Sequence, residues 1–381
     1  MDRIIKQIVG HIDVEYVPPG DKSISHRALM ISAMAKGENV ILGLAKSDDV
    51  LNTANILRAL GVRIEENDGE VIINSPGLDG FETPRQVLDC GNSGTTMRLM
   101  AGVLAGSNIS AVLAGDGSLQ SRPMQRIIKP LRAMGASIES FANGDRAPLA
   151  IVGGKLQGIM WSPEVASAQV KSAILLAGVG ATGKTKVIES LATRDHTERM
   201  LECFGADISY GKGWAEVTGG KTLVPRRYRV PGDISSAAFF MVLAAAIPGS
   251  KLTVRGVGLN DGRMGIIEVL RTMGANVTVG IQEHSPEPWG EIIVTGGLLR
   301  GFDIGGEMIP LTIDELPALA VAAAVAQGKS CVRNAEELRF KESDRISALL
   351  LELNKLGVKT EEYHDGFSIH GGSMRGALVD S

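Results

Sequence analysis

One polar segment near the amino terminus combines lysine, serine, histidine and arginine at the expected start of a helix: residues 20–27, GDKSISHR. Free backbone N–H groups at a helix start attract anions, and Ser23 or Ser25 can act as the N-cap. Lys22 and Arg27 add positive charge to the same place. The segment is therefore either an anion-binding site or a capped helix that carries surface cations.

Several later segments have the same character. Residues 90–98, CGNSGTTMR, contain glycines that let a ligand approach the backbone and hydroxyl groups that can donate hydrogen bonds. Arg122 directly precedes a proline expected to start a helix, and a guanidinium group suits two-point contact with a carboxylate or a phosphate. Residues 167–171 and 194–199, SAQVK and RDHTER, begin two more expected helices. Each segment alone also fits an ordinary turn, an N-cap or an exposed cation.

Two segments in the last third of the chain place carboxylates beside basic residues. Asp314 lies in TIDELP, and Glu342 lies in FKESDR between Lys341 and Arg345. A carboxylate near cations stays ionised and can serve as a base, whereas one sheltered from water can act as an acid. A charge-paired helix surface is the alternative for 341–345. Taken together, the segments predict a cleft that holds a polyanionic small molecule and supplies an acid and a base.

The composition excludes several other classes of protein. The chain has 381 residues, a formal net charge of −4 and only 4% aromatic residues, which does not favour a nucleic-acid partner. The longest apolar run, 237–247, is too short to span a bilayer, and the first twenty residues contain no apolar signal segment. The cysteines lack metal-ligand spacing and predict neither a disulfide framework nor a metal site. We therefore expect a cytoplasmic protein whose three cysteines are reduced thiols: Cys90, Cys203 and Cys331.

An internal repeat indicates the elements that must position these residues. An octet of the type LRALGVRI recurs with its glycine at positions 61, 135, 205 and 274, and a weaker copy has its glycine at 357. Each octet is typical of a last helical turn, a glycine just past the helix end and the start of a strand. Alanine-rich segments and β-branched runs alternate between the octets. The period of about 70 residues predicts a chain assembled from copies of one α/β unit.

Two Pro-Gly turns suggest where the chain passes between domains. Residues 17–20, VPPG, interrupt the opening strand pattern, and residues 229–233, RVPGD, form a similar turn. Three repeat units lie between these turns, and the remaining units follow the second turn.

Residues 178–185, GVGATGKT, satisfy the pattern of a nucleotide-binding P-loop but lack its context. Such a loop follows a strand and precedes a helix. Here residues 172–177 are helix-like and residues 186–189 are strand-like, so the order is inverted. We therefore expect a helix-to-strand turn here and not an ATP site.

The polar motifs resemble those of the 5-enolpyruvylshikimate-3-phosphate synthase family. GDKSISHR, GNSGTTMR, SRP at 121–123, SAQ at 167–169 and RFKESDR at 339–345 match that family in order along essentially the whole chain. The resemblance implies the α/β enolpyruvyl transferase fold, built as two domains of repeated βαβαββ units. Domain one would comprise residues 1–20 and 233–381, and domain two residues 21–232.

The resemblance also implies an activity. The enolpyruvyl group of phosphoenolpyruvate would be transferred to the 5-hydroxyl of shikimate 3-phosphate, with release of phosphate, in the pathway that supplies aromatic amino acids. No metal or organic cofactor, no nucleic acid and no membrane are implied. We further expect a monomer.

Residue roles follow from the same resemblance. Lys22 would act between both substrates, Asp314 would be the base near the 5-hydroxyl, and Glu342 would carry the proton for C3. The lysine next to Glu342, Lys341, would keep the pKa of Glu342 low before substrate enters, which complicates that role. The shikimate 3-phosphate site would comprise Lys22, Ser23, Arg27, Ser167, Ala168, Gln169, Arg194, Asp314 and Lys341. The phosphoenolpyruvate site would comprise Lys22, Asn92, Gly94, Arg122, Gln169 and Arg345.

The sequence departs from the family pattern in two respects. Family members continue with an Asp-His-Arg-Ile-Ala-Met motif, and the repeat likewise predicts a sixth unit that is incomplete at Ser381. An inactive truncated form, or a protein that binds shikimate 3-phosphate without turnover, is therefore the alternative function. The motifs RDHTE at 194–198 and SAQVK at 167–171 resemble the glyphosate-tolerant branch of the family. However, Gly262 replaces the threonine of that branch's Asn-x-Thr-Arg motif at 260–263.

Two related enzyme families fit the chain less well. The UDP-N-acetylglucosamine enolpyruvyl transferase uses a cysteine in the loop before its Arg-Pro pair, and residues 115–122 contain none. The histidine context of RNA 3′-phosphate cyclase is not found either.

Overall fold

The computed structural model describes residues 4, 10–142 and 144–380, which form five four-stranded sheets that repeat one arrangement. In each sheet one edge strand is parallel to its neighbour and the other strand pairs are antiparallel. Four of the five units have the chain order βαβαββ, and in the fifth the parallel edge strand β13 follows the other elements of its sheet. The α/β repeat predicted from the sequence is therefore confirmed.

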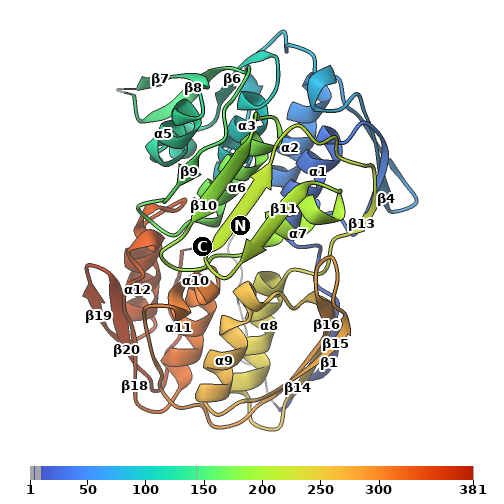
Figure 1. Cartoon of the computed structure of the whole chain (residues 1–381). Helices are drawn as coiled ribbons and strands as arrows, with labels where there is room; N and C mark the ends of the chain where they lie inside the picture. The colour runs from blue at the N-terminus through green and yellow to red at the C-terminus, as the bar shows by residue number, and fades with distance from the viewer. Residues whose placement is uncertain (1–3, 5–9, 143, 381) are drawn as a thin grey trace.

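Three of the units form the upper body of the molecule in Figure 1, which we define as residues 21–230. Its strands are β2 (Gly37–Leu42), β3 (Arg63–Asn67), β4 (Glu70–Ser75), β5 (Leu88–Asp89), β6 (Ser110–Ala114), β7 (Ser137–Ala142), β8 (Arg146–Val152), β9 (Met160–Trp161), β10 (Lys184–Ile188), β11 (Asp207–Gly211), β12 (Trp214–Thr218) and β13 (Arg227–Arg229). Its helices are α1 (Lys22–Met34), α2 (Asp48–Ala59), η1 (Leu78–Gly80), α3 (Gly94–Ala105), α4 (Gly117–Gln120), α5 (Gln125–Ala133), α6 (Ala168–Val179) and α7 (His196–Cys203). The sheet orders are β13-β2-β4-β3, β5-β6-β8-β7 and β11-β12-β10-β9.

Two units form the lower body, residues 10–20 and 231–380. Its strands are β1 (Asp13–Tyr16), β14 (Lys251–Gly258), β15 (Asn276–Glu283), β16 (Trp289–Thr295), β17 (Asp303–Ile304), β18 (Lys329–Val332), β19 (Lys359–Tyr363) and β20 (Gly366–His370). Its helices are α8 (Ile234–Ala246), η2 (Asp261–Arg263), α9 (Gly265–Thr272), α10 (Met308–Thr312), α11 (Leu316–Val325), η3 (Glu336–Phe340) and α12 (Arg345–Lys355). The sheet orders are β1-β14-β16-β15 and β17-β18-β20-β19.

The chain crosses between the bodies twice, and the crossings exchange strands. β1 pairs with β14 of the lower body before the chain enters α1, and β13 pairs with β2 of the upper body before the chain enters α8. The two crossing segments are hydrogen-bonded to each other, Asp21 N to Pro231 O at 2.8 Å and Asp233 N to Pro19 O at 2.8 Å. A Cβ atom at Gly20 would lie 1.8 Å from Gly43 O, so this crossing requires glycine.

Each body has its own cluster of buried apolar residues, from Ile24 to Val230 in the upper body and from Ile234 to Ile369 in the lower body. The upper cluster is built on the alanine-rich helices α1, α3 and α6, which pack so closely that a Cβ atom at Gly102 would lie 2.2 Å from Ala173 O. The exact division into domains at residues 20 and 232 stays a prediction.

The repeated glycines confirm the helix ends predicted from the octets. Gly61, Gly135, Gly205, Gly274 and Gly357 all have φ between 82° and 101°, the left-handed region that favours glycine. The P-loop-like segment is also as expected, because it joins the end of α6 to the start of β10.

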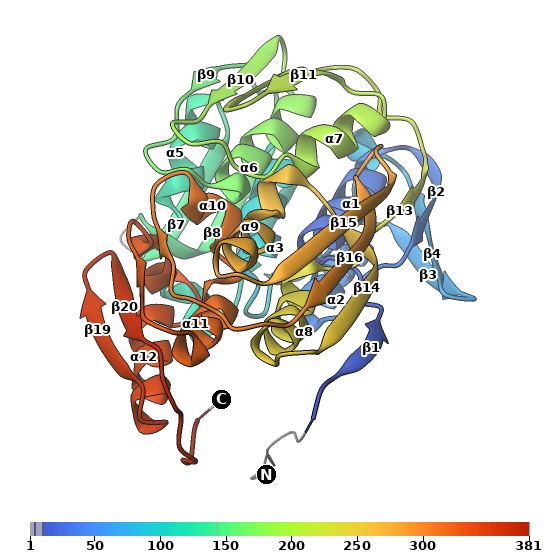
Figure 2. The ribbon, with the colours of Figure 1, turned by 90° about the horizontal axis from the view of Figure 1, so that it is seen from below.

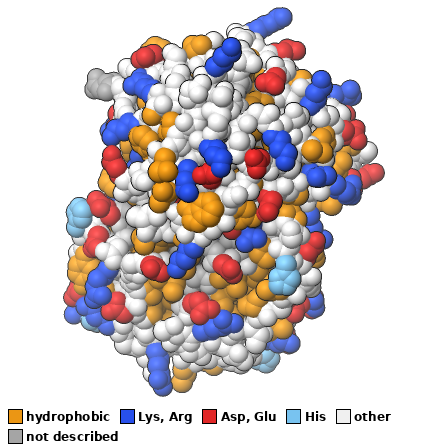
Figure 3. All heavy atoms as spheres, in the orientation of Figure 1, with side chains coloured by type: hydrophobic (Ala, Val, Ile, Leu, Met, Phe, Trp, Pro, Cys, Tyr) orange, Lys and Arg blue, Asp and Glu red, His pale blue; other side chains and the backbone are white. Residues whose placement is uncertain are grey.

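The two inner helices of the lower body are less covered than those of the upper body. α8 and α11 lie side by side (Figure 2) and are apolar on all faces, which is typical of helices that are buried all round. Yet they expose Phe239, Phe240, Leu243, Val321 and Val325. Elsewhere both signs of charge are interspersed over the surface, as the face in Figure 3 shows. Among the described residues, we find no helix with the length and apolar character needed to cross a bilayer.

Candidate functional site

The seven polar segments identified in the sequence all lead into helices, and they gather where the two bodies meet. From the upper body come the starts of α1, α3, α5, α6 and α7, and from the lower body come the starts of α11 and α12. Ion pairs cross between the bodies here. Arg194 pairs with Asp314, Arg126 Nη1 lies 2.8 Å from Glu337 Oε1, and Arg122 Nη1 lies 3.6 Å from Glu342 Oε1.

Lys22 occupies the first turn of α1 and remains partly accessible. Its ammonium group lies 3.1 Å from Asp49 Oδ2, and its side chain is 48% exposed. The prediction that Ser23 or Ser25 caps this helix is wrong: Asp21 is the cap and accepts from Ile24 N at 2.8 Å. Ser25 is buried. Its hydroxyl accepts a hydrogen bond at 2.9 Å from Ala45 N, which lies in the loop between β2 and α2.

Arg27 lies one turn further along α1 and is buried. Its Nε donates to Thr197 Oγ1 at 2.7 Å, Nη1 to Ser23 O at 2.8 Å and Nη2 to Ser172 Oγ at 2.8 Å. Burial lowers the pKa of this guanidinium to about 10. Arg27 therefore ties the starts of α1, α6 and α7 together in the ligand-free chain.

The start of α3 lies between two arginines. Ser93 is its N-cap and accepts from Thr96 N at 3.1 Å. A Cβ atom at Gly94 would lie 3.1 Å from Arg122 Nη1 and 3.3 Å from Arg98 Nη1. A helix N-terminus with two guanidinium groups beside it forms an anion site.

Arg122 is buried and aimed at this point. Its Nη2 donates to Asn92 Oδ1, and its Nε has no hydrogen-bond partner among the described residues. The prediction that Pro123 begins a helix is wrong, because α5 starts at Gln125. The backbone before this helix is tied to a distant segment by the hydrogen bond that Met124 N donates to Asp145 O at 2.7 Å.

Arg98 is a site residue that the sequence analysis did not select. Its Nη1 donates to Gln169 Oε1 at 2.6 Å, and Gln169 Nε2 donates to Thr95 Oγ1 at 2.9 Å. Burial lowers the pKa of Arg98 to about 10. The arginine in GNSGTTMR was the available signal, since it lies one helical turn after Gly94. Ser167 and Ala168 stand beside Gln169 as the cap and first residue of α6, and the Ser167 side chain makes no capping hydrogen bond.

Asp314 lies at the centre of the crossing ion pairs. Arg194 binds its Oδ2, and Arg345 Nη1 lies 3.6 Å from its Oδ1. Burial raises the pKa of Asp314, but the charges of Arg194, Lys341 and Arg263 outweigh burial and hold it well below its usual range. Asp314 is therefore an ionised carboxylate over the whole physiological pH range, as a base must be.

Glu342 is also held ionised. Burial raises its pKa, but the charge of Arg345 outweighs that effect and the resulting pKa is about 2. Arg122 acts in the same direction. The sequence pointed to the neighbouring Lys341 as the cation responsible, whereas the structure assigns this effect chiefly to Arg345, because the two side chains form a close ion pair. Lys341 itself is half-buried, and burial lowers its pKa although Asp314 opposes this.

Lys171 is a second residue near the site that was not among the site residues predicted from the sequence. It is buried in α6 with its Nζ 2.9 Å from Glu189 Oε2 and 2.8 Å from Glu198 Oε1. It also donates to Thr193 O at 3.3 Å, directly before Arg194. Lys171 therefore holds the segment that delivers Arg194 to Asp314.

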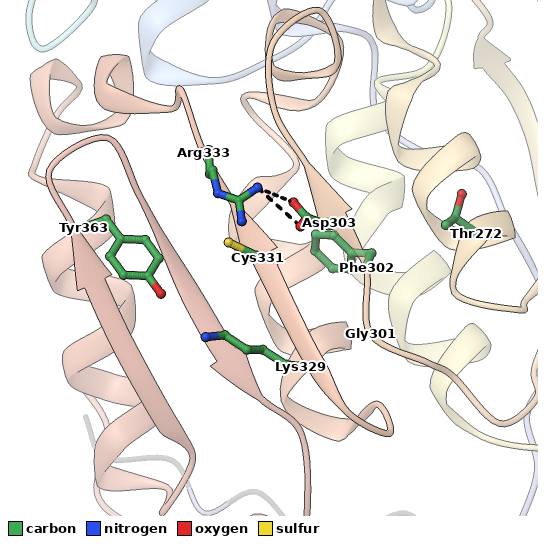
Figure 4. Close-up of a pocket in the computed structure, with 8 residues that line it drawn as sticks. All are labelled: Thr272, Gly301, Phe302, Asp303, Lys329, Cys331, Arg333 and Tyr363. Carbon is green, nitrogen blue, oxygen red and sulfur yellow. Dashed lines mark hydrogen bonds and ion pairs between the residues drawn. The ribbon is translucent and has the colours of Figure 1, made fainter.

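A separate pocket of about 540 Å³ lies on the β17-β18-β20-β19 sheet (Figure 4). Its cations are already paired: Arg333 Nη1 lies 3.0 Å from Asp303 Oδ1, and Lys329 Nζ lies 3.0 Å from Glu361 Oε2. No group of three or more potential metal ligands occurs in the part of the chain that the structure describes. The site between the bodies therefore remains the candidate for chemistry.

Comparisons with known proteins show the family to which the chain belongs. The family model described as EPSP synthase (3-phosphoshikimate 1-carboxyvinyltransferase) matches residues 3–381. The chain is 49% identical over 368 residues to the 3-phosphoshikimate 1-carboxyvinyltransferase of Geotalea daltonii, covering 96% of this chain and 85% of that protein. It is 50% identical over 371 residues to the same enzyme of Geobacter metallireducens, covering 97% and 85%.

A solved structure of EPSP synthase from Acinetobacter baumannii superposes with a TM-score of 0.84. It is 44% identical in sequence, and the match covers 95% of this chain and 82% of that chain. The family model and the relatives match nearly the whole chain. The chain is a member of the EPSP synthase family.

Proposed function

We propose that this chain transfers the enolpyruvyl group of phosphoenolpyruvate to the 5-hydroxyl of shikimate 3-phosphate and releases phosphate. The observation that carries the proposal is the meeting of an ionised carboxylate, Asp314, with arginines and helix starts from both bodies. The relatives that match nearly the whole chain are named for this activity, which favours catalysis over a binder without turnover.

Shikimate 3-phosphate would bind on the side of α1, α6 and α7. Its phosphate would contact Ser167 and Arg194 from the upper body and Lys341 from the lower body. Lys22, whose ammonium group is partly accessible, would lie between the two substrates. The remaining contacts would come from Ser23, Arg27, Ala168, Gln169 and Asp314.

Phosphoenolpyruvate would bind at the start of α3. Gly94 would leave room for an anion beside the guanidinium of Arg122. Arg345 of the lower body pairs with Glu342, which in turn lies 3.6 Å from Arg122 Nη1. Both substrate anions would therefore bridge the two bodies. Asn92, Gln169 and Lys22 complete this set.

The chemistry would proceed by addition and elimination. Asp314 takes the proton of the 5-hydroxyl while that oxygen bonds to C2 of phosphoenolpyruvate and C3 gains a proton. Glu342 would be the donor of the proton that C3 gains. It is ionised beside Arg345 and Arg122, so it would first take up a proton when ligand anions engage these arginines and raise its pKa. Phosphate would then leave C2 while C3 returns one proton to the Glu342 carboxylate, which restores the double bond in the product.

We also propose the domain boundaries, the cellular location and the oligomeric state of the chain. The separate buried clusters support two domains, residues 1–20 with 233–381 and residues 21–232. The free thiols of Cys90, Cys203 and Cys331 support a cytoplasmic location. We propose a monomer, because both substrate sites are assembled from one chain.

Phosphorus NMR with near-stoichiometric shikimate 3-phosphate and phosphoenolpyruvate tests the activity. Inorganic phosphate and an enolpyruvyl product should appear with the unmodified chain, and Asp314→Asn should abolish them. If the shikimate 3-phosphate signal broadens while no phosphate forms, the chain binds without turnover and the proposed activity is refuted.

A further inference from the structure

Arg263 occupies a buried cluster of charges where the two chain crossings meet. Its side chain is 4% exposed, and it reaches three carboxylates: Asp21 at 3.1 Å, Asp233 at 3.4 Å and Glu315 at 3.2 Å. Its Nη2 also donates to the Ser235 hydroxyl. Because the cluster is buried, removing the guanidinium would leave three carboxylates without their shared partner.

Two of these carboxylates hold helix starts. Asp21 caps α1 through its bond from Ile24 N at 2.8 Å, and Asp233 caps α8 through its bond from Ser235 N at 2.8 Å. Asp233 also accepts from Lys22 N at 3.3 Å. Arg263 is thus connected to the backbone that carries the Lys22 side chain.

The third carboxylate lies beside the candidate base. Glu315 directly follows Asp314, is 1% exposed, and accepts from both Arg263 and the Ser235 hydroxyl. The backbone at Asp314 is therefore anchored through its neighbour to the same guanidinium that is connected to Lys22.

The turn that carries Arg263 also touches the segment of Arg194. Asn260 Oδ1 accepts from Gly262 N at 2.9 Å, which closes the turn, and Asn260 Nδ2 donates to Asp195 Oδ1 at 2.7 Å. A Cβ atom at Gly262 would lie 3.1 Å from the Arg194 Cα. The turn therefore packs against the residue that pairs with Asp314.

We infer that Arg263 is a positioning residue for the enolpyruvyl transfer: it fixes Lys22 of the upper body and Asp314 of the lower body relative to each other. The inference rests on the proposed function. A lysine cannot replace Arg263, because only a planar guanidinium presents separate donors to Asp21 on one nitrogen and to Asp233 and Glu315 on the other.

The test compares Arg263→Gln and Arg263→Lys with the control Arg255→Gln. Arg255 also pairs with two carboxylates, Glu15 and Glu291, but is exposed on β14. The measurements are kcat with saturating substrates and the Kd for shikimate 3-phosphate by calorimetry. In both Arg263 variants kcat should fall about 10²-fold, as expected for misplacement of reacting groups by about 1 Å. The Kd should change less than about threefold, because most of that site belongs to the upper body alone.

The control variant should match the unmodified chain in both quantities. Unchanged kcat in a folded Arg263 variant would overturn the inference, and so would equal losses in kcat and affinity, which indicate general destabilisation. If neither Arg263 variant folds, Asp21→Asn tests the inference, since it removes only the ion pair between Asp21 and Arg263. A fall in the kcat of this variant supports the inference, and an unchanged kcat rejects it.

If the unmodified chain does not turn over, the proposed function fails separately and the positioning is judged by hydrogen exchange. The Ile24 and Ser235 amides are bonded to the carboxylates that Arg263 holds. Their exchange should accelerate at least about tenfold in Arg263→Gln and not in Arg255→Gln. Equal exchange in the two variants would reject the inference.

Discussion

Replacing Lys171 with methionine should destabilise the upper body strongly. The ammonium of Lys171 lies within 2.9 Å of Glu189 and Glu198, and all three side chains are less than 5% exposed. Removing one partner of a buried ion pair costs about 3–5 kcal/mol, and here two carboxylates lose the same partner. Burial raises the pKa of Glu198, although the charge of Lys171 opposes this. We therefore expect a loss near the upper end of that range.

Such a loss is large against a total stability of about 5–15 kcal/mol. The midpoint of thermal unfolding should fall by about 10 °C or more. The KM for shikimate 3-phosphate should also rise, because Lys171 holds the Thr193 carbonyl next to Arg194.

Urea and thermal unfolding followed by circular dichroism measure this effect, with Lys184→Met as the matched control. Lys184 pairs with Glu216 at 2.8 Å but is 67% exposed, so its loss should barely move the midpoint. A Lys171→Met midpoint no lower than that of Lys184→Met would refute the reasoning. If Lys171→Met does not fold, Glu198→Gln, which leaves the pair with Glu189, should give an intermediate loss.

Three further predictions concern the site itself. Gly94→Ala places a Cβ atom 3.1 Å from Arg122 Nη1. Steady-state kinetics should therefore show a rise of about tenfold in the KM for phosphoenolpyruvate and little change in the KM for shikimate 3-phosphate. Equal changes in the two KM values would contradict the proposed phosphoenolpyruvate site. The pKa of Glu342 falls from 4.5 to about 2 on folding, so its ionised form stabilises the fold above pH 4.5 and this contribution is lost as the pH falls toward 2. Glu342→Gln should therefore lower the urea midpoint at pH 6 but not near pH 2, and a constant difference would argue against the assignment. Glu337→Gln breaks the pair with Arg126 between the bodies, so small-angle scattering should show a larger ligand-free molecule that shikimate 3-phosphate compacts; identical radii in all states would exclude this closure.

The sequence predicts the repeat and the helix ends well because both are local properties. A glycine after an amphipathic helix has one favourable conformation, and the positive φ of Gly61 or Gly274 needs no tertiary information. The polar segments lead into helices for the same reason. The cap of α1 could not be predicted, because Asp21, Ser23 and Ser25 are all competent caps. In the structure Asp21 accepts from Ile24 N, and the Ser25 hydroxyl instead accepts from Ala45 N of a distant loop.

The pairing within the site could not be predicted, since it depends on how the bodies approach. Arg98 and Lys171 lie inside recognised motifs, but their partners Gln169, Glu189 and Glu198 come from other elements. Arg263 is a stronger example. Its carboxylates lie 242, 30 and 52 residues away in the chain, and nothing in the spacing brings them to one point.

The ion pairs of the site bear on how the two proposed substrates would influence each other. Arg194 is paired with Asp314, and Arg345 is paired with Glu342. A substrate anion that binds Arg194 or Arg345 therefore replaces the carboxylate with which that arginine is paired. The free energy gained from the new contact is offset by the loss of the old one. Under the proposed roles, the exchange would have a second effect. A phosphate that takes Arg194 would leave Asp314 free to accept the hydroxyl proton, and an anion that takes Arg345 would raise the pKa of Glu342 toward a value at which it holds a proton. The proposed base and acid would then become competent together only with both ligands bound, so reaction with either substrate alone would be suppressed.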